Sequence, residues 1–260
     1  MRYSIIAAAL VSVLSAAKVF AVDDSVISTP RGAKVNVKTH KAAGANQPLL
    51  IVAPGQGCNW LGAMFESLAT KGAERGYTVI RFNWNYCNSS PSDPQPSDKF
   101  VNEVEDFNAV LKFAKELPAV DTNHVFLAGK SLGSMVGQRV FTAHTDLRAL
   151  ALLTPVCSYE TDDSGNQYPA PLPVTDESYP GLRDDKRQIL MAGGSKDPIC
   201  FLPILHKYLG ESKGNIVTAT FGGDHGLNIK NQAGIVDQSK TAGNINAFVV
   251  MVLNWLDLQL

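Results

Sequence analysis

Short runs of apolar residues recur along the chain, and each ends in a glycine, a proline or a polar loop. The runs do not alternate between apolar and polar positions, as expected for strands of a parallel sheet that is covered on both faces. Longer segments with apolar residues at steps of three and four separate them, and this is the period of an amphipathic helix. The predicted buried strands are Leu49–Ala53, Tyr77–Phe82, Val125–Ala128, Ala149–Leu153, Ile189–Ala192 and Ile216–Phe221.

An antiparallel hairpin is predicted ahead of these strand–helix repeats. Its strands are Val26–Ser28 and Val35–Thr39, joined through Pro30-Arg31-Gly32. Helices are predicted over Lys99–Glu116 and, near the end of the chain, over Asn244–Leu258. The predicted fold class is therefore α/β: an open, mostly parallel sheet with an N-terminal antiparallel hairpin and helices on both faces. Ligands of such sheets bind beyond the carboxyl ends of the strands.

The segment Met1–Ala21 has the order of a secretory signal peptide. Arg2 supplies the positive charge, Ile5–Leu14 is an apolar stretch too short to span a bilayer, and small residues precede a cleavage site. We expect the mature chain to begin at Val22, although cleavage after Ala17 also fits, and a buried N-terminal helix is the competing interpretation. Because no repeat or linker follows, residues 22–260 are predicted to form one domain.

Composition argues against several classes of protein. The 260 residues carry 23 Lys and Arg against 24 Asp and Glu, so nothing indicates the basic surface that nucleic-acid binding needs. A charged fraction of 18% with 14 prolines is not that of a coiled coil or a disordered chain. The 4 cysteines show no zinc-binding spacing. In an exported protein their even number predicts disulfides of undetermined pairing, with buried free thiols as the alternative.

The clearest chemical motif is Gly129-Lys130-Ser131-Leu132-Gly133, which follows a predicted buried strand and precedes a predicted helix over Ser134–His144. It has the G-x-S-x-G pattern of a nucleophile elbow, whose glycines allow the tight turn that lifts the serine above the sheet. A phosphate-binding loop is the competing interpretation, but that motif needs a glycine where the chain has His124. The pattern therefore predicts Ser131 as a nucleophile.

A serine nucleophile needs a base, and the base needs an orienting carboxylate. His225 follows a late strand in a glycine-flanked loop, which can bring its imidazole to the elbow; an ordinary loop histidine is the alternative. Asp197 follows the strand Ile189–Ala192 and is the predicted acid, whereas Asp224 is expected to be a solvated turn residue. The chain order Ser131, Asp197, His225 is a known triad order. The remaining histidines, in the hairpin, at the wrong end of the sheet or in helical stretches, are His40, His124, His144 and His206.

Two backbone N–H groups should donate hydrogen bonds to the oxyanion of the tetrahedral intermediate. Each donor should stabilise the transition state by about 3 kcal/mol. Leu132, directly after the nucleophile, is the first candidate. The second should come from the glycine-rich loop after Leu49–Ala53, where we favour Gln56 and place Gly57 second. Gln56 as a plain turn residue is the alternative.

As a set, these motifs resemble the α/β-hydrolase superfamily: Pro54-Gly55-Gln56-Gly57, Gly129-Lys130-Ser131-Leu132-Gly133-Ser134, Gly193-Gly194-Ser195-Lys196-Asp197-Pro198-Ile199-Cys200 and Asp224-His225. Over about residues 46–258 the chain is most similar to the dienelactone-hydrolase-like branch that includes a subunit of the NSL chromatin complex and a testis-expressed protein. The resemblance implies the α/β-hydrolase fold and nucleophile, acid and base roles for Ser131, Asp197 and His225. It implies no substrate, because none is firmly attached to this branch. Dienelactone hydrolases proper use a cysteine nucleophile, whereas this chain has Ser131, so lactone cleavage is not implied.

The strand order of this superfamily implies which cysteines pair. Cys58 and Cys87 follow neighbouring strands, as do Cys157 and Cys200, and neighbouring strands lie about 5 Å apart. The implied disulfides are therefore Cys58–Cys87 and Cys157–Cys200, each worth about 2–4 kcal/mol.

A short irregular cap insertion is expected over about residues 158–185, where this superfamily often inserts a cap and where prolines disfavour a helix. Tyr159, Tyr168 and Tyr179 are expected either to line an acyl pocket or to be exposed loop residues. Trp60 and Trp84 lie beside the same rim, where a packing role is the alternative.

The predicted function is that of an exported serine hydrolase, secreted or periplasmic, which cleaves an ester, thioester or related acyl bond through an acyl-enzyme on Ser131. Its partner would be a small-molecule acyl substrate, with no nucleic acid, and no motif for a metal, nucleotide or haem cofactor is visible. A non-catalytic binding or scaffold protein with a hydrolase fold is the alternative, and an acyltransferase is the third candidate. The acyl-chain preference and the oligomeric state stay open.

Overall fold

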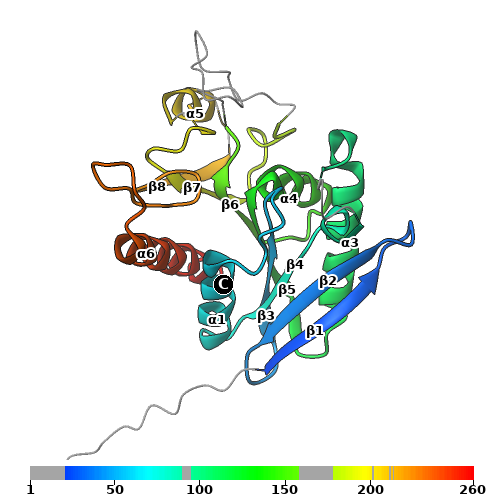
Figure 1. Ribbon diagram of the computed structural model, residues 1–260. Coiled ribbons are helices and arrows are strands. Elements are labelled where there is room, and N and C mark those ends of the chain that lie inside the picture. The colour runs from blue at the N-terminus through cyan, green and yellow to red at the C-terminus, as the bar shows by residue number, and fades with distance from the viewer. Residues whose placement is uncertain (1–20, 90–94, 158–177, 201, 211, 213) are drawn as a thin grey trace, which may run out of the picture.

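The computed structural model describes residues 21–89, 95–157, 178–200, 202–210, 212 and 214–260 (Figure 1), so the predicted signal peptide, except for Ala21, lies outside the described residues. At its centre is an eight-stranded sheet with the order β1-β2-β4-β3-β5-β6-β7-β8. β1 pairs antiparallel with β2 and β2 with β4, whereas the later pairs are parallel. The strands are β1 Ala21–Ser28, β2 Lys34–Lys41, β3 Gln47–Ala53, β4 Thr78–Phe82, β5 Val120–Ser131, β6 Ala149–Pro155, β7 Gln188–Gly194 and β8 Asn215–Phe221.

Helices cover both faces of the sheet, α1 and α6 on one side and α3 and α4 on the other (Figure 1). Leu49 and Ile51 belong to the apolar core under α3 and α4, while Leu50 and Val52 belong to the core under α1 and α6. Because both faces of a strand are buried, the strands are unbroken apolar runs in the sequence. The helices are α1 Ala63–Glu74, α2 Asn85–Ser89, the 3-10 turn η1 Asp98–Phe100, α3 Val101–Lys115, α4 Leu132–Ala143, α5 Leu202–Leu209 and α6 Gln238–Asp257.

The predicted strands, the hairpin and the mostly parallel sheet are confirmed, but the bounds of the three predicted helices differ from the prediction. α4 is Leu132–Ala143 instead of Ser134–His144. α6 begins at Gln238 instead of Asn244, because the Asp237 carboxylate caps it by accepting the Lys240 N–H at 3.0 Å. The helix predicted from Lys99 begins instead as α3 at Val101. The preceding residues, Lys99 and Phe100, have left-handed φ angles of 51° and 61° and interrupt the helical turn.

The parallel pairing brings the carboxyl ends of β3, β5, β7 and β8 to one edge of the sheet. The loops at this edge carry the Gly55–Gly57 turn, Ser131, Asp197 and His225. Ligands of α/β sheets bind at this edge, so the predicted site residues share the expected location. Within the described ranges, no helix is both long and apolar enough to cross a bilayer.

Candidate active site

Ser131 stands at the junction of β5 and α4 in a strained backbone conformation. Its φ and ψ angles are 53° and −121°, a combination that L-residues rarely adopt. Gly129 and Gly133 make the turn possible, because a Cβ on Gly129 would lie 2.0 Å from the Gly133 carbonyl oxygen. A Cβ on Gly133 would lie 2.5 Å from the carbonyl oxygen of Pro54. The serine is thereby raised above the sheet in the geometry of a nucleophile elbow.

His225 and Asp197 meet through a hydrogen bond between loops that are 28 positions apart. His225 Nδ1 lies 2.8 Å from Asp197 Oδ2, and the other carboxylate oxygen accepts the Ile199 N–H at 2.9 Å. The opposite ring nitrogen of His225, Nε2, is buried and has no hydrogen-bond partner within the described part of the chain. Buried polar atoms are normally satisfied, so this nitrogen is a candidate general base that would find its partner in a substrate complex.

The turn that carries Asp197 and the loop that carries His225 are joined through their backbones. The Lys196 N–H donates to the Gly223 carbonyl oxygen at 2.9 Å. A Cβ on Gly194 would lie 2.4 Å from that same oxygen, so the loops approach closely because position 194 is a glycine. Asp197 and His225, the candidate acid and base, are therefore placed by one continuous set of backbone contacts.

An open cleft of about 570 Å³ lies at this edge of the sheet. Ser131 and His225 line it together with Lys130 and Gln56, whereas Asp197 lies behind the imidazole and outside the lining. Among the described residues, no group of three His, Cys, Asp or Glu side chains is placed to hold a metal ion. The apolar side chains in the cleft wall include Met64, Phe65, Ile199 and Ile245.

Both candidate oxyanion donors belong to segments next to Ser131. Leu132 is the first residue of α4, so its N–H has no acceptor within the helix. Gln56 lines the cleft in the loop after β3. In that loop Gly55 lies so close to the elbow that a Cβ on it would be 3.3 Å from the Ser131 Cβ.

A sequence profile of the alpha/beta hydrolase domain family matches residues 46–253, which is most of the chain. The chain belongs to this family. Its sheet order, covering helices and serine elbow are those of an α/β hydrolase, so the fold that the resemblance implied is confirmed.

Solved structures and one curated protein are similar to this α/β hydrolase. An esterase from Pyrococcus furiosus is 15% identical, with a TM-score of 0.63 over 92% of this chain and 90% of that chain. An alpha-beta serine hydrolase homologue from Coxiella burnetii is 18% identical, with a TM-score of 0.61 over 90% and 95% of the two chains. The quorum-quenching protein AidA of Acinetobacter baumannii is 29% identical over 111 residues, which are 41% of this chain and only 34% of AidA.

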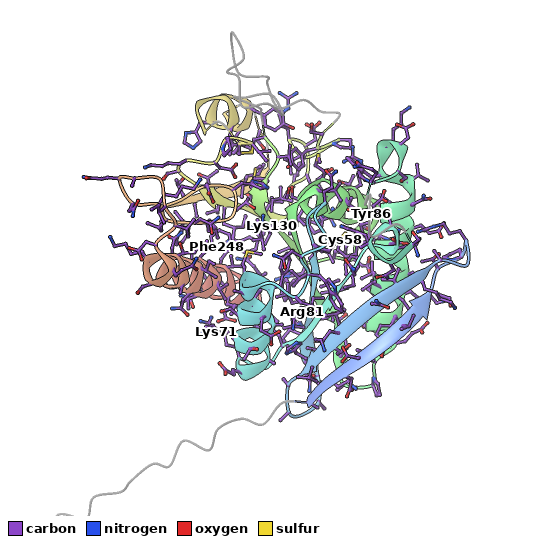
Figure 2. All side chains as sticks on the ribbon, in the orientation of Figure 1. Cys58, Lys71, Arg81, Tyr86, Lys130 and Phe248 are labelled. Atoms are coloured by element: carbon purple, nitrogen blue, oxygen red, sulfur yellow. A yellow bond between two sulfur atoms is a disulfide. The ribbon has the colours of Figure 1, made fainter. Side chains whose placement is uncertain are left out.

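Lys130 has a place in this α/β-hydrolase site that no sequence pattern indicated. Lys130 lies in the middle of the molecule (Figure 2). Its ammonium group donates a hydrogen bond to the His225 carbonyl oxygen at 3.2 Å, so it ties the end of β5 to the loop of the candidate base. Burial lowers the pKa of Lys130 to about 8, and the carboxylates of Asp197 and Asp224 oppose this shift only in part. Asp224 itself closes a turn by accepting the Gly226 N–H at 2.9 Å.

Two disulfides brace the loops around the cleft, and they join the pairs that the resemblance implied. Cys58–Cys87 connects the loop after β3 to α2, with the two Cα atoms 5.7 Å apart. Cys157–Cys200 connects the end of β6 to the turn of Asp197, with a Cα separation of 4.3 Å. The chain has no free cysteine, so the alternative of buried thiols does not apply.

Residues 158–177 of the expected cap, with Tyr159 and Tyr168, lie outside the described part of the chain. Tyr179 follows that segment and is fully buried, and its hydroxyl lies 2.9 Å from Ser134 Oγ. Ser134 Oγ in turn donates to the Ser131 carbonyl oxygen at 2.5 Å. Tyr179 thus supports the elbow from the protein interior, and both expectations for it, a pocket wall and an exposed loop, are wrong.

The other histidines have structural partners or lie away from the cleft. His124 Nδ1 lies 2.7 Å from an Asp121 carboxylate oxygen, and His144 Nε2 lies 2.8 Å from Asn108 Oδ1. None of these histidines lines the cleft that Ser131 shares with His225. The remaining two are His40, which is buried beside Arg81, and the exposed His206.

Proposed function

We propose that this α/β hydrolase is an exported serine hydrolase that cleaves an ester, thioester or related acyl bond of a small molecule. One observation carries the proposal. A strained serine shares a cleft with a buried imidazole nitrogen that has no partner in the described chain, and a carboxylate holds the other side of that imidazole. Esterases and serine hydrolase homologues among the similar structures support the same reaction class.

In the first half-reaction, Ser131 Oγ attacks the acyl carbonyl carbon while His225 Nε2 takes the hydroxyl proton. Asp197 keeps the imidazole proton on Nδ1 and stabilises the imidazolium that forms. The carbonyl oxygen, now negatively charged, accepts hydrogen bonds from the Leu132 and Gln56 N–H groups. The bond to the leaving group then breaks, the leaving group takes the proton from Nε2, and an acyl ester remains on the serine.

In the second half-reaction, His225 Nε2 removes a proton from a water molecule as its oxygen attacks the acyl carbon. The tetrahedral intermediate collapses, the bond to Ser131 Oγ breaks, and the serine recovers its proton from the imidazolium. A free carboxylic acid is the product. An alcohol or thiol acceptor in place of water would make the protein an acyltransferase, which analysis of the products distinguishes.

The proposal places this hydrolase outside the cytoplasm, secreted or periplasmic, with residues 1–21 as its signal peptide. Two disulfides favour an oxidising compartment, where such bonds form and persist. Membership of the dienelactone-hydrolase-like branch is part of the same proposal and is supported by the Gly-Lys-Ser-Leu-Gly-Ser elbow of residues 129–134 and by Cys200 after the acid.

A fluorophosphonate probe and a series of nitrophenyl esters of increasing acyl length test the proposal on the purified protein. We expect the probe to label the wild type but not Ser131→Ala, and kcat to fall by about 10⁴-fold or more in Ser131→Ala and His225→Ala. His124→Ala, a histidine away from the cleft, should keep the wild-type rate. Ester hydrolysis by Ser131→Ala at the wild-type rate would exclude the mechanism. A wild type that is neither labelled nor active would instead favour a non-catalytic binding or scaffold protein.

A further inference from the structure

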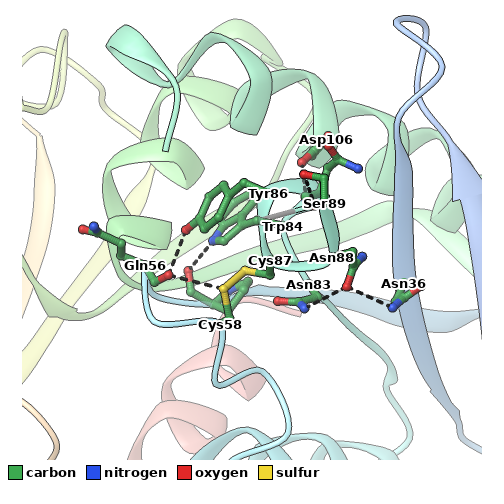
Figure 3. Close-up of a disulfide and its surroundings, with 12 residues drawn as sticks. Asn36, Gln56, Cys58, Asn83, Trp84, Tyr86, Cys87, Asn88, Ser89 and Asp106 are labelled. Atoms are coloured by element: carbon green, nitrogen blue, oxygen red, sulfur yellow. Dashed lines mark hydrogen bonds between the residues drawn. A yellow bond between two sulfur atoms is a disulfide. The ribbon is translucent and has the colours of Figure 1, made fainter. Parts of the chain in front are cut away.

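A short segment after β4 contacts the loop of the proposed oxyanion donor at three points (Figure 3). The Trp84 Nε1–H donates to the Pro54 carbonyl oxygen at 3.2 Å. The Tyr86 hydroxyl donates to the Gln56 carbonyl oxygen at 3.0 Å. The disulfide Cys58–Cys87 is the third point. The segment therefore holds the loop by its backbone and not only by side-chain packing.

The two bonded carbonyl groups flank the peptide unit that carries the Gln56 N–H. A peptide unit is planar, so a bond that holds its carbonyl oxygen also sets the direction of the N–H in the same unit. Trp84 thereby fixes the unit before Gly55, and Tyr86 fixes the unit after Gln56. The Tyr86 bond therefore sets the direction of the Gly57 N–H directly, and the Gln56 N–H belongs to the unit between the two restrained units.

The loop needs this support because it approaches Ser131 closely at a glycine. A Cβ on Gly55 would lie 3.3 Å from the Ser131 Cβ and 3.8 Å from its Oγ. Gly55 favours this close approach, but it and Gly57 place two glycines in one short loop, and glycine gives the backbone the widest conformational freedom of any residue. An oxyanion donor is effective when it is already oriented before the charge develops. The fixed orientation of the donor N–H has to come from contacts with residues outside the loop.

The Trp84 and Tyr86 side chains are themselves anchored. Trp84 is fully buried and packs edge-on against Phe82, with the ring centroids 4.9 Å apart. Tyr86 lies in α2, where the Asn85 N–H donates to the buried Asp106 carboxylate at 2.8 Å. Burial raises the pKa of Tyr86, so its hydroxyl keeps the proton that it donates.

We propose that Tyr86 and Trp84 are positioning residues, which orient the Gln56 N–H and the adjacent Gly57 N–H toward the oxyanion. The inference rests on the proposed function of Ser131. The oxyanion exists in the transition state and not in the bound ester, so a loss of alignment lowers kcat and leaves KM nearly unchanged.

Tyr86→Phe removes the hydroxyl and retains the ring. We expect kcat for a nitrophenyl ester to fall about tenfold, less than for loss of a whole oxyanion donor, while KM changes by less than about twofold. A trifluoromethyl ketone forms a hemiketal on the serine whose oxyanion occupies the same position. Its affinity should fall by the same factor as kcat/KM. Trp84→Phe, which removes the indole N–H, should change kcat in the same direction.

Tyr77→Phe is the matched control. Tyr77 is buried, as Tyr86 is, and its hydroxyl donates to Asp257 at 2.9 Å, at a position that does not line the cleft. Both variants lose one hydroxyl hydrogen bond and should lower Tm comparably, but only Tyr86→Phe should slow turnover. Unchanged kcat in Tyr86→Phe, or equal losses in both variants, would overturn the positioning role. Absence of ester hydrolysis and of fluorophosphonate labelling in the wild type would refute the proposed function itself.

Discussion

Lys130 should make the stability of this protein rise with pH across the alkaline range. Its side chain is partly buried beside the cleft, where the ammonium group contacts the His225 carbonyl oxygen. Burial lowers the pKa of Lys130 from 10.5 to about 8 in the native state. Between these two values the unfolded chain binds a proton that the native state has released.

The sign and size of the effect follow from this difference in bound protons. Below the native pKa of Lys130 both states are protonated, and folding bears the full cost of burying the charge. Above the unfolded-state pKa both are neutral and the cost is gone, so stability is lost as the pH falls through this window. From about pH 7 to about pH 9.5 the free energy of unfolding should rise on the order of 2 kcal/mol. Burial also raises the pKa of Tyr77 and Tyr86, and a raised tyrosine pKa lowers the stability of the protein as the pH rises through the tyrosine range. The measurement therefore stops at about pH 9.5, below that range.

Lys130→Met isolates the effect, because methionine keeps much of the apolar stem without the charge. Denaturant unfolding of wild type and variant is measured at several pH values across this range. The difference in free energy of unfolding between them should move in favour of the wild type by about 2 kcal/mol. Lys112→Met, at an exposed position of α3, should show no such trend. A difference between wild type and Lys130→Met that stays constant within about 0.5 kcal/mol would show that the ammonium is not buried in solution.

Two further predictions concern the acid and the first disulfide. Asp197→Asn should lower kcat for ester hydrolysis by about 10⁴-fold, because an amide no longer enforces the Nδ1–H tautomer of the imidazole. Asp121→Asn, outside the cleft, is its control, and a loss below about tenfold would exclude Asp197 as the orienting group. Replacement of both Cys58 and Cys87 by serine should lower the free energy of unfolding by about 2–4 kcal/mol and lower kcat more than it changes KM. An unchanged kcat, with loss of the disulfide verified by mass spectrometry, would show that the Gln56 loop is ordered without it.

The strands and the nucleophile elbow could be predicted because each depends on a local pattern. The side chains from Leu49 to Val52 point alternately into the two apolar cores. Because both faces of the strand are buried, every one of these positions must be apolar. A Cβ on Gly129 would meet the Gly133 carbonyl group of the same turn, so this part of the motif contains its own steric reason, whereas Gly133 is needed because the end of β3 lies against it. Features of this kind are complete within a few residues, and a single sequence is enough to find them.

Other features depended on partners that are distant in the chain. Tyr86 donates to a carbonyl group 30 positions away, and the Lys130 ammonium bonds to a carbonyl group 95 positions away. Neither residue type nor spacing distinguishes these side chains from an ordinary core tyrosine or a solvated lysine. The early start of α6 had a local signal, since Asp237 is a good N-cap residue, but the apolar period becomes visible only several residues later.

The glycines at this site explain why its loops are held in place by side chains from other segments of the chain. Gly133 and Gly194 stand where another backbone leaves no room for a side chain, and Gly55 stands where the Ser131 side chain leaves little, so close approach favours glycine. The same substitution removes the restraint that a side chain would place on the loop. Order must then come from groups outside each loop, and here Tyr86 bonds to the Gln56 carbonyl oxygen and Lys130, from the elbow, bonds to the carbonyl oxygen of the His225 loop. A second hydrolase with these motifs but without such contacts should bind an ester equally well and turn it over more slowly, because alignment of the oxyanion donors contributes to kcat and not to ground-state binding.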